Sequence, residues 1–181
     1  MIVWINGAYG AGKSTVAQLL DANLEDSYIF DPEEVGNCVR ESKPKSLWRD
    51  DFQDYPSWRE MTYFLLKELY GMYEGTILVP MTVLNENYLK ETIGRLEQDE
   101  IPVLHFILMA GREQIASRIL ERGEDEDCWC MRQIDRCVDI LGKDIRGIEV
   151  NTDERDAEAV AQEIISCIQR KCPGLKWKVQ Q

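Results

Sequence analysis

The chain has 181 residues, of which 44% are hydrophobic and 30% are charged, and its formal net charge is −12 at pH 7. This length and balance are typical of one soluble globular domain with a sizeable core. The acidic charge argues against nucleic acids and anionic lipid surfaces as partners, because both require clustered cations. No apolar run approaches the length of a membrane-spanning helix, so we predict no stable membrane insertion.

Six cysteines are spread over the chain without a Cys-x-x-Cys pair, and His105 is the only histidine. This pattern lacks the ligand spacing of a zinc site, and we interpret the cysteines as reduced thiols. The first predicted strand begins at residue 2, which leaves no room for a signal peptide. We therefore predict a cytoplasmic protein.

A glycine-rich motif lies between the first two predicted elements, a strand over residues 2–6 and a helix over residues 14–24. Its residues are Gly7, Ala8, Tyr9, Gly10, Ala11, Gly12, Lys13, Ser14 and Thr15. The spacing matches the G-x-x-x-x-G-K-[ST] phosphate loop in its expected setting. In such a loop the backbone N–H groups and the helix N-terminus surround a phosphate, and Lys13 adds a charge at the β/γ-phosphates. The Ser14 hydroxyl is placed for Mg²⁺, so the motif predicts binding of a nucleotide with Mg²⁺.

Asp31 follows directly after a second strand, predicted over residues 28–30. Ligands of parallel sheets bind beyond the carboxyl ends of the strands, so Asp31 is a candidate to accept a proton from a substrate hydroxyl beside the γ-phosphate. Pro32 can occupy the first turn of a helix. Capping of that helix is therefore the alternative role of Asp31, with Glu33 and Glu34 complementing the helix dipole.

The least regular stretch, residues 41–55, ends in a segment dense in carboxylates, aromatic rings and amides. Binding loops often have this composition, and the candidates for substrate contact in residues 50–59 are Asp51, Gln53, Trp58 and Arg59. A helix predicted over residues 57–73 carries apolar residues at helical spacing. Trp58 therefore fits the core as well as a pocket.

The third strand, predicted over residues 76–81, leads into Val79-Pro80-Met81-Thr82 without an acidic residue. Many phosphate-loop enzymes have at this point an Asp that holds the water shell of Mg²⁺. The guanine-selecting Asn-Lys-x-Asp motif is absent too. The missing acid is the strongest argument in the sequence against ordinary ATPase activity.

Two arginine pairs lie on helices predicted over residues 111–122 and 129–141, after a helix over 86–98 and a strand over 103–109. The pairs are Arg118 with Arg122 and Arg132 with Arg136, each spaced to share one helix face. With the polar connector 123–127, they fit a mobile lid over about residues 118–136 that neutralises the transferred phosphoryl group. The alternative is a solvated surface on which these arginines pair with neighbouring acids.

A last strand over residues 148–150 and a helix over residues 156–170 complete the pattern. The alternation of strands and helices with short links predicts a parallel sheet covered on both faces, hence a three-layer α/β domain. We place this domain at residues 1–172, followed by a basic and loosely docked tail at 173–181.

Several of these stretches resemble the tunicamycin-resistance family of small phosphate-loop proteins. They are Ile5-Asn6-Gly7-Ala8 with the phosphate loop, residues 28–33 around Asp-Pro-Glu, residues 50–59, Val79-Pro80-Met81-Thr82, Ile93-Gly94-Arg95-Leu96 and Gln133-Ile134-Asp135-Arg136-Cys137. That family is similar in turn to nucleoside-monophosphate-kinase-like enzymes, including chloramphenicol phosphotransferases. The resemblance implies a five-stranded parallel sheet of order 2-3-1-4-5 with a helical lid, and ATP as the nucleotide. It also implies an acceptor site near Asp31, phosphate-directed arginines at Arg118 and Arg122, and an adenine pocket near residues 151–153.

We hypothesise that the chain is an ATP- and Mg²⁺-dependent phosphotransferase acting on a small-molecule hydroxyl, such as that of a nucleoside antibiotic. Lys13, Asp31, Arg118 and Arg122 would be its catalytic residues, and Asp51, Gln53, Trp58, Arg59 and Thr82 would shape the acceptor pocket. The alternative is a protein that binds ATP and sequesters the antibiotic without phosphoryl transfer. The acceptor and the oligomeric state stay open at this point.

Overall fold

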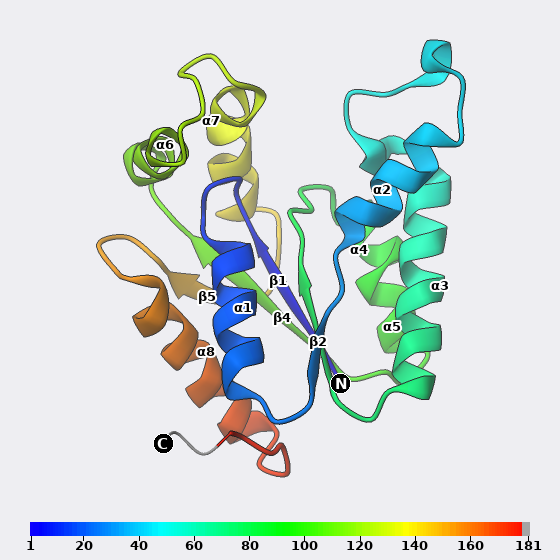
Figure 1. Cartoon of the computed structure of the whole chain (residues 1–181), viewed down its shortest axis with the longest axis vertical. Coiled ribbons are helices and arrows are strands. Elements are labelled where there is room, and N and C mark those ends of the chain that lie inside the picture. The colour runs from blue at the N-terminus through cyan, green and yellow to red at the C-terminus, as the bar shows by residue number, and fades with distance from the viewer. Residues whose placement is uncertain (179–181) are drawn as a thin grey trace.

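The computed structural model describes residues 1–178, which form a five-stranded sheet with helices on both faces (Figure 1). The strands are β1 (Ile2–Gly7), β2 (Ser27–Ile29), β3 (Thr76–Pro80), β4 (Val103–Met109) and β5 (Ile148–Asn151). The helices are α1 (Lys13–Asn23), α2 (Pro32–Glu41), α3 (Pro56–Met72), α4 (Glu86–Glu91), α5 (Ile93–Gln98), α6 (Arg112–Glu121), α7 (Trp129–Leu141) and α8 (Ala157–Lys171). Two short 3-10 helices, η1 (Lys45–Leu47) and η2 (Phe52–Asp54), lie between α2 and α3.

The strand order is β2-β3-β1-β4-β5, and every neighbouring pair is parallel. This confirms the predicted fold class, a three-layer α/β phosphate-loop fold, and the order that the resemblance implied. Strand β1 is central, because Ile2–Ile5 pair with β3 on one side and with β4 on the other. The loop that follows β1 therefore opens at the middle of the carboxyl edge of the sheet, where ligands of such sheets bind.

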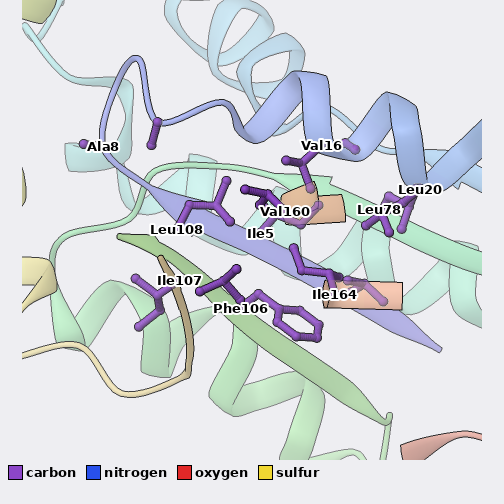
Figure 2. Packing of buried hydrophobic residues seen from close by; sticks show 14 of the residues in the cluster. Ile5, Ala8, Val16, Leu20, Leu78, Phe106, Ile107, Leu108, Val160 and Ile164 are labelled. Atoms are coloured by element: carbon purple, nitrogen blue, oxygen red, sulfur yellow. The ribbon is translucent and has the colours of Figure 1, made fainter. Parts of the chain in front are cut away.

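Two apolar layers hold the helices on the sheet. On one face α1 and α8 pack over β1, β3 and β4, as the buried side chains in Figure 2 show. That layer includes Val16, Leu20, Val160, Ile164, Ile5, Leu78 and Phe106. On the other face Trp4 of β1 lies in a second cluster with Trp58 and Leu66 of α3 and Leu96 of α5. Strands covered on both faces explain why β1 and β3 are fully buried apolar runs.

Two helical stretches differ from the expectation. The single helix expected over residues 86–98 is broken at Thr92, which has φ −111° and ψ −84° and separates α4 from α5. The Thr92 hydroxyl donates to the carbonyl of Tyr88 at 2.8 Å, a side-chain bond that competes with the regular helix pattern. The second stretch is the helix that begins at Pro32. The sequence suggested its first turn but no end, and in the structure it continues for ten residues as α2.

The end of the described chain is docked rather than loose. Residue Trp177 forms an antiparallel bridge with Leu24, the link between α1 and β2. The Glu25 N–H donates to the Lys176 carbonyl at 3.2 Å, and the Lys178 N–H donates to the Asn23 carbonyl at 2.8 Å. The part of the predicted tail at residues 179–181 lies outside the described residues. Among the helices within residues 1–178, none is both long and apolar enough to cross a bilayer.

Candidate functional site

The phosphate loop has the backbone conformation that its glycines were expected to supply. Gly10 and Gly12 have φ values of +86° and +96°, a region that residues with a Cβ avoid, and Gly12 is the N-cap of α1. A Cβ on Gly10 would lie 3.0 Å from Ile119 of α6, so the loop also packs closely against that helix. The loop thus presents its amides and the N-terminus of α1 to one place, as an anion site requires.

Lys13 and two aromatic rings line the mouth of this loop. The Lys13 ammonium donates to the Ala8 carbonyl at 2.9 Å and lies 5.5 Å from the centre of the Tyr9 ring. Burial lowers the pKa of Lys13 to about 8, because a desolvated ammonium is destabilised. The Tyr9 ring meets Trp129 edge to face, with centroids 4.7 Å apart, although Trp129 is 38% exposed. Trp129 begins α7, so this part of the predicted lid, about residues 118–136, lies beside the phosphate loop.

A first cavity of about 410 Å³, here called the nucleoside-side cavity, lies between the phosphate loop and the β5–α8 connection. Its wall is formed by Gly10, Ala11, Gly12, Thr15, Val16, Arg118, Glu121, Arg122, Thr152, Arg155, Ala157 and Val160. Arg118 donates to the Thr152 carbonyl at 2.6 Å and to the Thr152 hydroxyl at 3.0 Å. These bonds attach the Arg118 guanidinium to the loop after β5, the region expected to hold a base.

A second cavity of about 450 Å³, the phosphate-side cavity, opens on the other side of the loop. It is lined by Tyr9, Gly10, Lys13, Ser14, Glu33, Arg40, Asp50, Asp51, Phe52, Pro80, Arg122, Glu124, Trp129 and Cys130. Gly10 and Arg122 belong to the walls of both cavities, so the two spaces meet at the phosphate loop. Arg122 caps the end of α6 and pairs with Glu124 at 3.1 Å.

Two carboxylates at the start of α2, those of Asp31 and Glu33, have different surroundings. Asp31 is the N-cap, and its Oδ1 accepts the Glu33 N–H at 2.9 Å, as in the capping alternative. Glu33, which the sequence suggested only as a partner of the helix dipole, lines the phosphate-side cavity, whereas Asp31 does not. Glu33 is solvent-exposed, and partial desolvation raises the pKa of its carboxyl; the neighbouring Asp31 raises it further, and Lys13 opposes both effects.

Four of the predicted acceptor residues are buried. Arg59, Gln53 and Thr82 form a hydrogen-bonded chain that ends at the phosphate loop, and Trp58 bonds separately to the start of α2. The Thr82 hydroxyl donates to the Gly7 carbonyl at 2.7 Å, and Gln53 Nε2 donates to the Thr82 carbonyl at 2.9 Å. Arg59 donates to the Gln53 carbonyl at 2.6 Å, and the Trp58 indole donates to the Pro32 carbonyl at 2.9 Å. These side chains hold η2, α3 and the loop after β3 together. Of the five predicted residues, only Asp51 lines the phosphate-side cavity.

The arginines of α7 face different surroundings. Arg132 donates to the Asp127 carbonyl in the connector before the helix. Arg136 contacts Gln133 at 3.4 Å and lines a small cavity of about 40 Å³ with Asp51 and Gln53. Its charge lowers the pKa of Asp51, whereas burial, the larger effect, raises it. The α7 helix and the η2 loop thus face each other across the acceptor side, and a lid over 118–136 stays a prediction.

Several residues of the two cavities were missed from the sequence. Arg40 follows Glu33 by seven positions, two helical turns, so its place in the same wall could have been predicted once α2 was recognised. Trp129 and Arg155 carry no local signal, because their positions depend on elements distant in the chain. Within residues 1–178, no group of three or more His, Cys, Asp or Glu side chains is arranged to hold a metal ion.

Comparisons with known proteins agree with this architecture. The family model described as "AAA domain" matches residues 2–140. The tunicamycin resistance protein of Deinococcus radiodurans superposes with a TM-score of 0.81 and 23% identity, covering 99% of this chain and 98% of that one. The shikimate kinase of Acinetobacter baumannii in complex with shikimate has a TM-score of 0.60 and 17% identity, with 94% of each chain covered. A gluconokinase of Sinorhizobium meliloti 1021 has a TM-score of 0.60 and 15% identity, over 94% of this chain and 96% of that one.

No curated protein sequence matches the chain. The structural likenesses, at identities of 15–23%, concern the fold, and they confirm the predicted resemblance to tunicamycin-resistance and kinase-like phosphate-loop proteins. The matched family model covers most of the chain and includes the phosphate loop, α2, α6 and nearly all of α7. The chain therefore belongs to the AAA domain family, as a nucleotide-binding protein with the phosphate-loop kinase-like fold.

Proposed function

We propose that the chain is an ATP-dependent phosphotransferase that acts on a small-molecule hydroxyl. The observation that carries this proposal is the pair of cavities that meet at the phosphate loop and share Gly10 and Arg122. One space suits a nucleoside and the other an acceptor, and the phosphoryl group would cross between them over the loop. A protein that only hydrolyses ATP has no need of the second, aromatic-lined space.

The nucleotide would lie along the loop from the nucleoside-side cavity to Lys13. The loop amides and the Lys13 ammonium would hold the β- and γ-phosphates, and phosphate charge would favour the protonated form of this buried lysine. Thr152 and the loop after β5 would contact the base, held in place by Arg118. This gives Arg118 a nucleoside-side role rather than the transfer role expected from its spacing.

The residues around the loop suit a bound Mg²⁺. Ser14 is the second residue of α1 and lines the phosphate-side cavity next to Lys13. Mg²⁺ keeps most of its waters and takes few protein ligands, so one hydroxyl beside the phosphates is an adequate protein contribution. When bound, the ion would neutralise charge on the phosphates.

Arg122 is the arginine best placed to stabilise the transferring group, because it lines both cavities. A guanidinium there would neutralise charge that develops on the phosphoryl oxygens. Movement of α7, which carries Trp129, Arg132 and Arg136, would close the acceptor side and exclude water.

The overall likeness to the Deinococcus tunicamycin resistance protein supports a nucleoside antibiotic as the acceptor. A second candidate function is ATP-dependent sequestration of such a ligand without chemistry. It is favoured by one observation: β3 ends at Pro80 in the wall of the phosphate-side cavity, where related enzymes supply an acidic residue for the Mg²⁺ water shell.

Incubation with ATP, Mg²⁺ and tunicamycin, followed by mass spectrometry of the ligand, separates the two functions. A mass gain of one phosphoryl group supports the phosphotransferase. Tight binding with an unmodified ligand supports sequestration instead. A Lys13→Ala variant is the control: at an ATP concentration near the wild-type Kd, it should strongly reduce ATP-dependent effects of either kind, because it binds ATP more weakly.

A further inference from the structure

One face of α2 is turned toward the phosphate-side cavity. Glu33 and Arg40 lie seven residues apart, which places them on the same side of the helix, and both line that cavity. Gly36, between them, is covered by the ring of Phe52, another residue of the cavity wall. The preceding Asp31 and the following Glu34 are not part of the wall. The helix register itself therefore selects Glu33 among the three carboxylates.

The start of α2 is held firmly in this orientation. The Trp58 indole, fully buried in α3, donates to the carbonyl of Pro32 at 2.9 Å. The Asp31 carboxylate accepts the Glu33 N–H at 2.9 Å, so one of its oxygens is occupied in capping the helix. Both contacts fix the backbone immediately before and at Glu33. Within residues 1–178, the Glu33 carboxylate makes no hydrogen bond or ion pair that would hold it away from the cavity.

Glu33 is solvent-exposed at the open mouth of the cavity, and its surroundings still raise the pKa of its carboxyl above that of a free glutamate. Partial desolvation has the largest effect, and the adjacent negative charges of Asp31 and Glu34 raise the pKa as well. The Lys13 ammonium lowers the pKa of Glu33, and both residues line the phosphate-side cavity. The other charged groups in the wall of the same cavity are Arg40, Asp50, Asp51, Arg122 and Glu124.

We propose that Glu33, rather than Asp31, accepts the proton of the acceptor hydroxyl during phosphoryl transfer, and that Asp31 is a positioning residue. This rests on the proposed function. The acceptor oxygen forms a bond to the γ-phosphorus while its proton passes to a Glu33 carboxylate oxygen. The bond between the γ-phosphorus and the bridging oxygen of ADP breaks, and ADP leaves with that electron pair. Protonated Glu33 then loses its proton to water.

The test compares three variants, Glu33→Gln, Asp31→Asn and Glu34→Gln, with the wild-type protein. ATP consumption is measured between pH 5 and 9, with water or tunicamycin as the acceptor and at several Mg²⁺ concentrations, and ATP affinity is measured by calorimetry. We expect Glu33→Gln to lower turnover by about 10²–10⁴-fold, the usual contribution of general base catalysis, and to abolish the acid limb of the pH profile. Its ATP affinity should stay within about threefold, because the loop amides and Lys13 are untouched.

Asp31→Asn should keep most of the turnover, because Asn caps helices as well as Asp does. Its acid limb should move to lower pH, since the like charge that raises the pKa of Glu33 is gone. Glu34→Gln is the matched control; it should leave the rate at neutral pH unchanged within about twofold, because this residue lies outside the cavity wall. Its acid limb should move less than that of Asp31→Asn, because Glu34 has the smaller effect on the pKa of Glu33.

Turnover that survives in Glu33→Gln, or is lost in Asp31→Asn instead, would overturn the assignment while leaving the phosphotransferase intact. Restoration of Glu33→Gln by raised Mg²⁺ would also overturn it, because Glu33 would then hold the water shell of the metal. A wild-type protein that consumes no ATP with either acceptor would refute the proposed function and the role of Glu33 together.

Discussion

Gly36 of α2 is the position where the structure makes the sharpest prediction about stability. A Cβ added there would lie 2.5, 2.6 and 2.7 Å from three atoms of the Phe52 ring, closer than any ordinary contact. The ring cannot withdraw freely, because it packs on Trp58 with centroids 5.6 Å apart. In Gly36→Ala, a helix-propensity gain of about 1 kcal/mol competes with an overpacking cost of about 1–3 kcal/mol.

We therefore expect Gly36→Ala to be destabilised by up to about 2 kcal/mol, which for this chain length lowers Tm by about 2–4 °C per kcal/mol. Gly71 of α3 is the matched control: it is also helical, but a Cβ there meets nothing within 4 Å. Gly71→Ala should gain up to about 1 kcal/mol from propensity alone. Urea unfolding of both variants measures the difference.

A double variant with Phe52→Ala completes the test. If the clash with the ring is the cause, Gly36→Ala should gain up to about 1 kcal/mol in the Phe52→Ala background, with a coupling energy of about 1–3 kcal/mol, the cost of the clash. An increase in stability for Gly36→Ala equal to that of Gly71→Ala would refute the reasoning. So would strict additivity with Phe52→Ala.

Three further predictions concern single side chains. Lys13→Ala should weaken ATP binding by about 10–100-fold in calorimetry, because a charge-assisted contact to the phosphates is lost; unchanged affinity would contradict the phosphate-loop site. Arg118→Met should weaken ATP but not tripolyphosphate, because its bonds to Thr152 support the nucleoside side; equal weakening of both ligands would instead support a phosphate role. His105 has its pKa lowered to about 4 from 6.5 by burial, so the neutral form is favoured in the folded state. Its stabilising effect is complete above pH 6.5 and is lost as the pH falls toward 4, by roughly 3 kcal/mol. In His105→Leu, urea unfolding between pH 7 and 4 should show a flatter pH dependence, and an identical slope to the wild type would argue against a buried neutral imidazole.

The parts of the fold that depend on local signals could be predicted from the sequence. The phosphate loop is one continuous motif, and the central strands β1 and β3 are mostly apolar runs that are buried on both faces. The break at Thr92 was missed because the apolar spacing of residues 86–98 continues through it, whereas the side-chain bond to the Tyr88 carbonyl has no counterpart in a hydrophobic pattern.

The acceptor side was predicted less well, for a physical reason. Gln53, Arg59 and Thr82 are polar residues of the kind that binding loops contain, but in the structure each donates to a backbone carbonyl within the protein. Arg59 also donates to the Glu91 carboxylate at 2.5 Å. Composition does not distinguish a side chain that binds a ligand from one that holds a loop. Likewise, the spacing of Arg118 predicted its helix face, but its partner Thr152 comes 34 residues later in the chain.

Both ends of the described chain lie at the edge of the sheet opposite the phosphate loop (Figure 1). The amino group of Met1 donates to the Gly75 carbonyl at 3.3 Å, and Lys178 pairs with Asn23 at the far end of α1. A biotin or affinity tag placed before Met1 would thus anchor the molecule to a sensor surface with both cavities turned toward the solution. Immobilised binding measurements with nucleotides and antibiotics are for this reason feasible without re-engineering the chain.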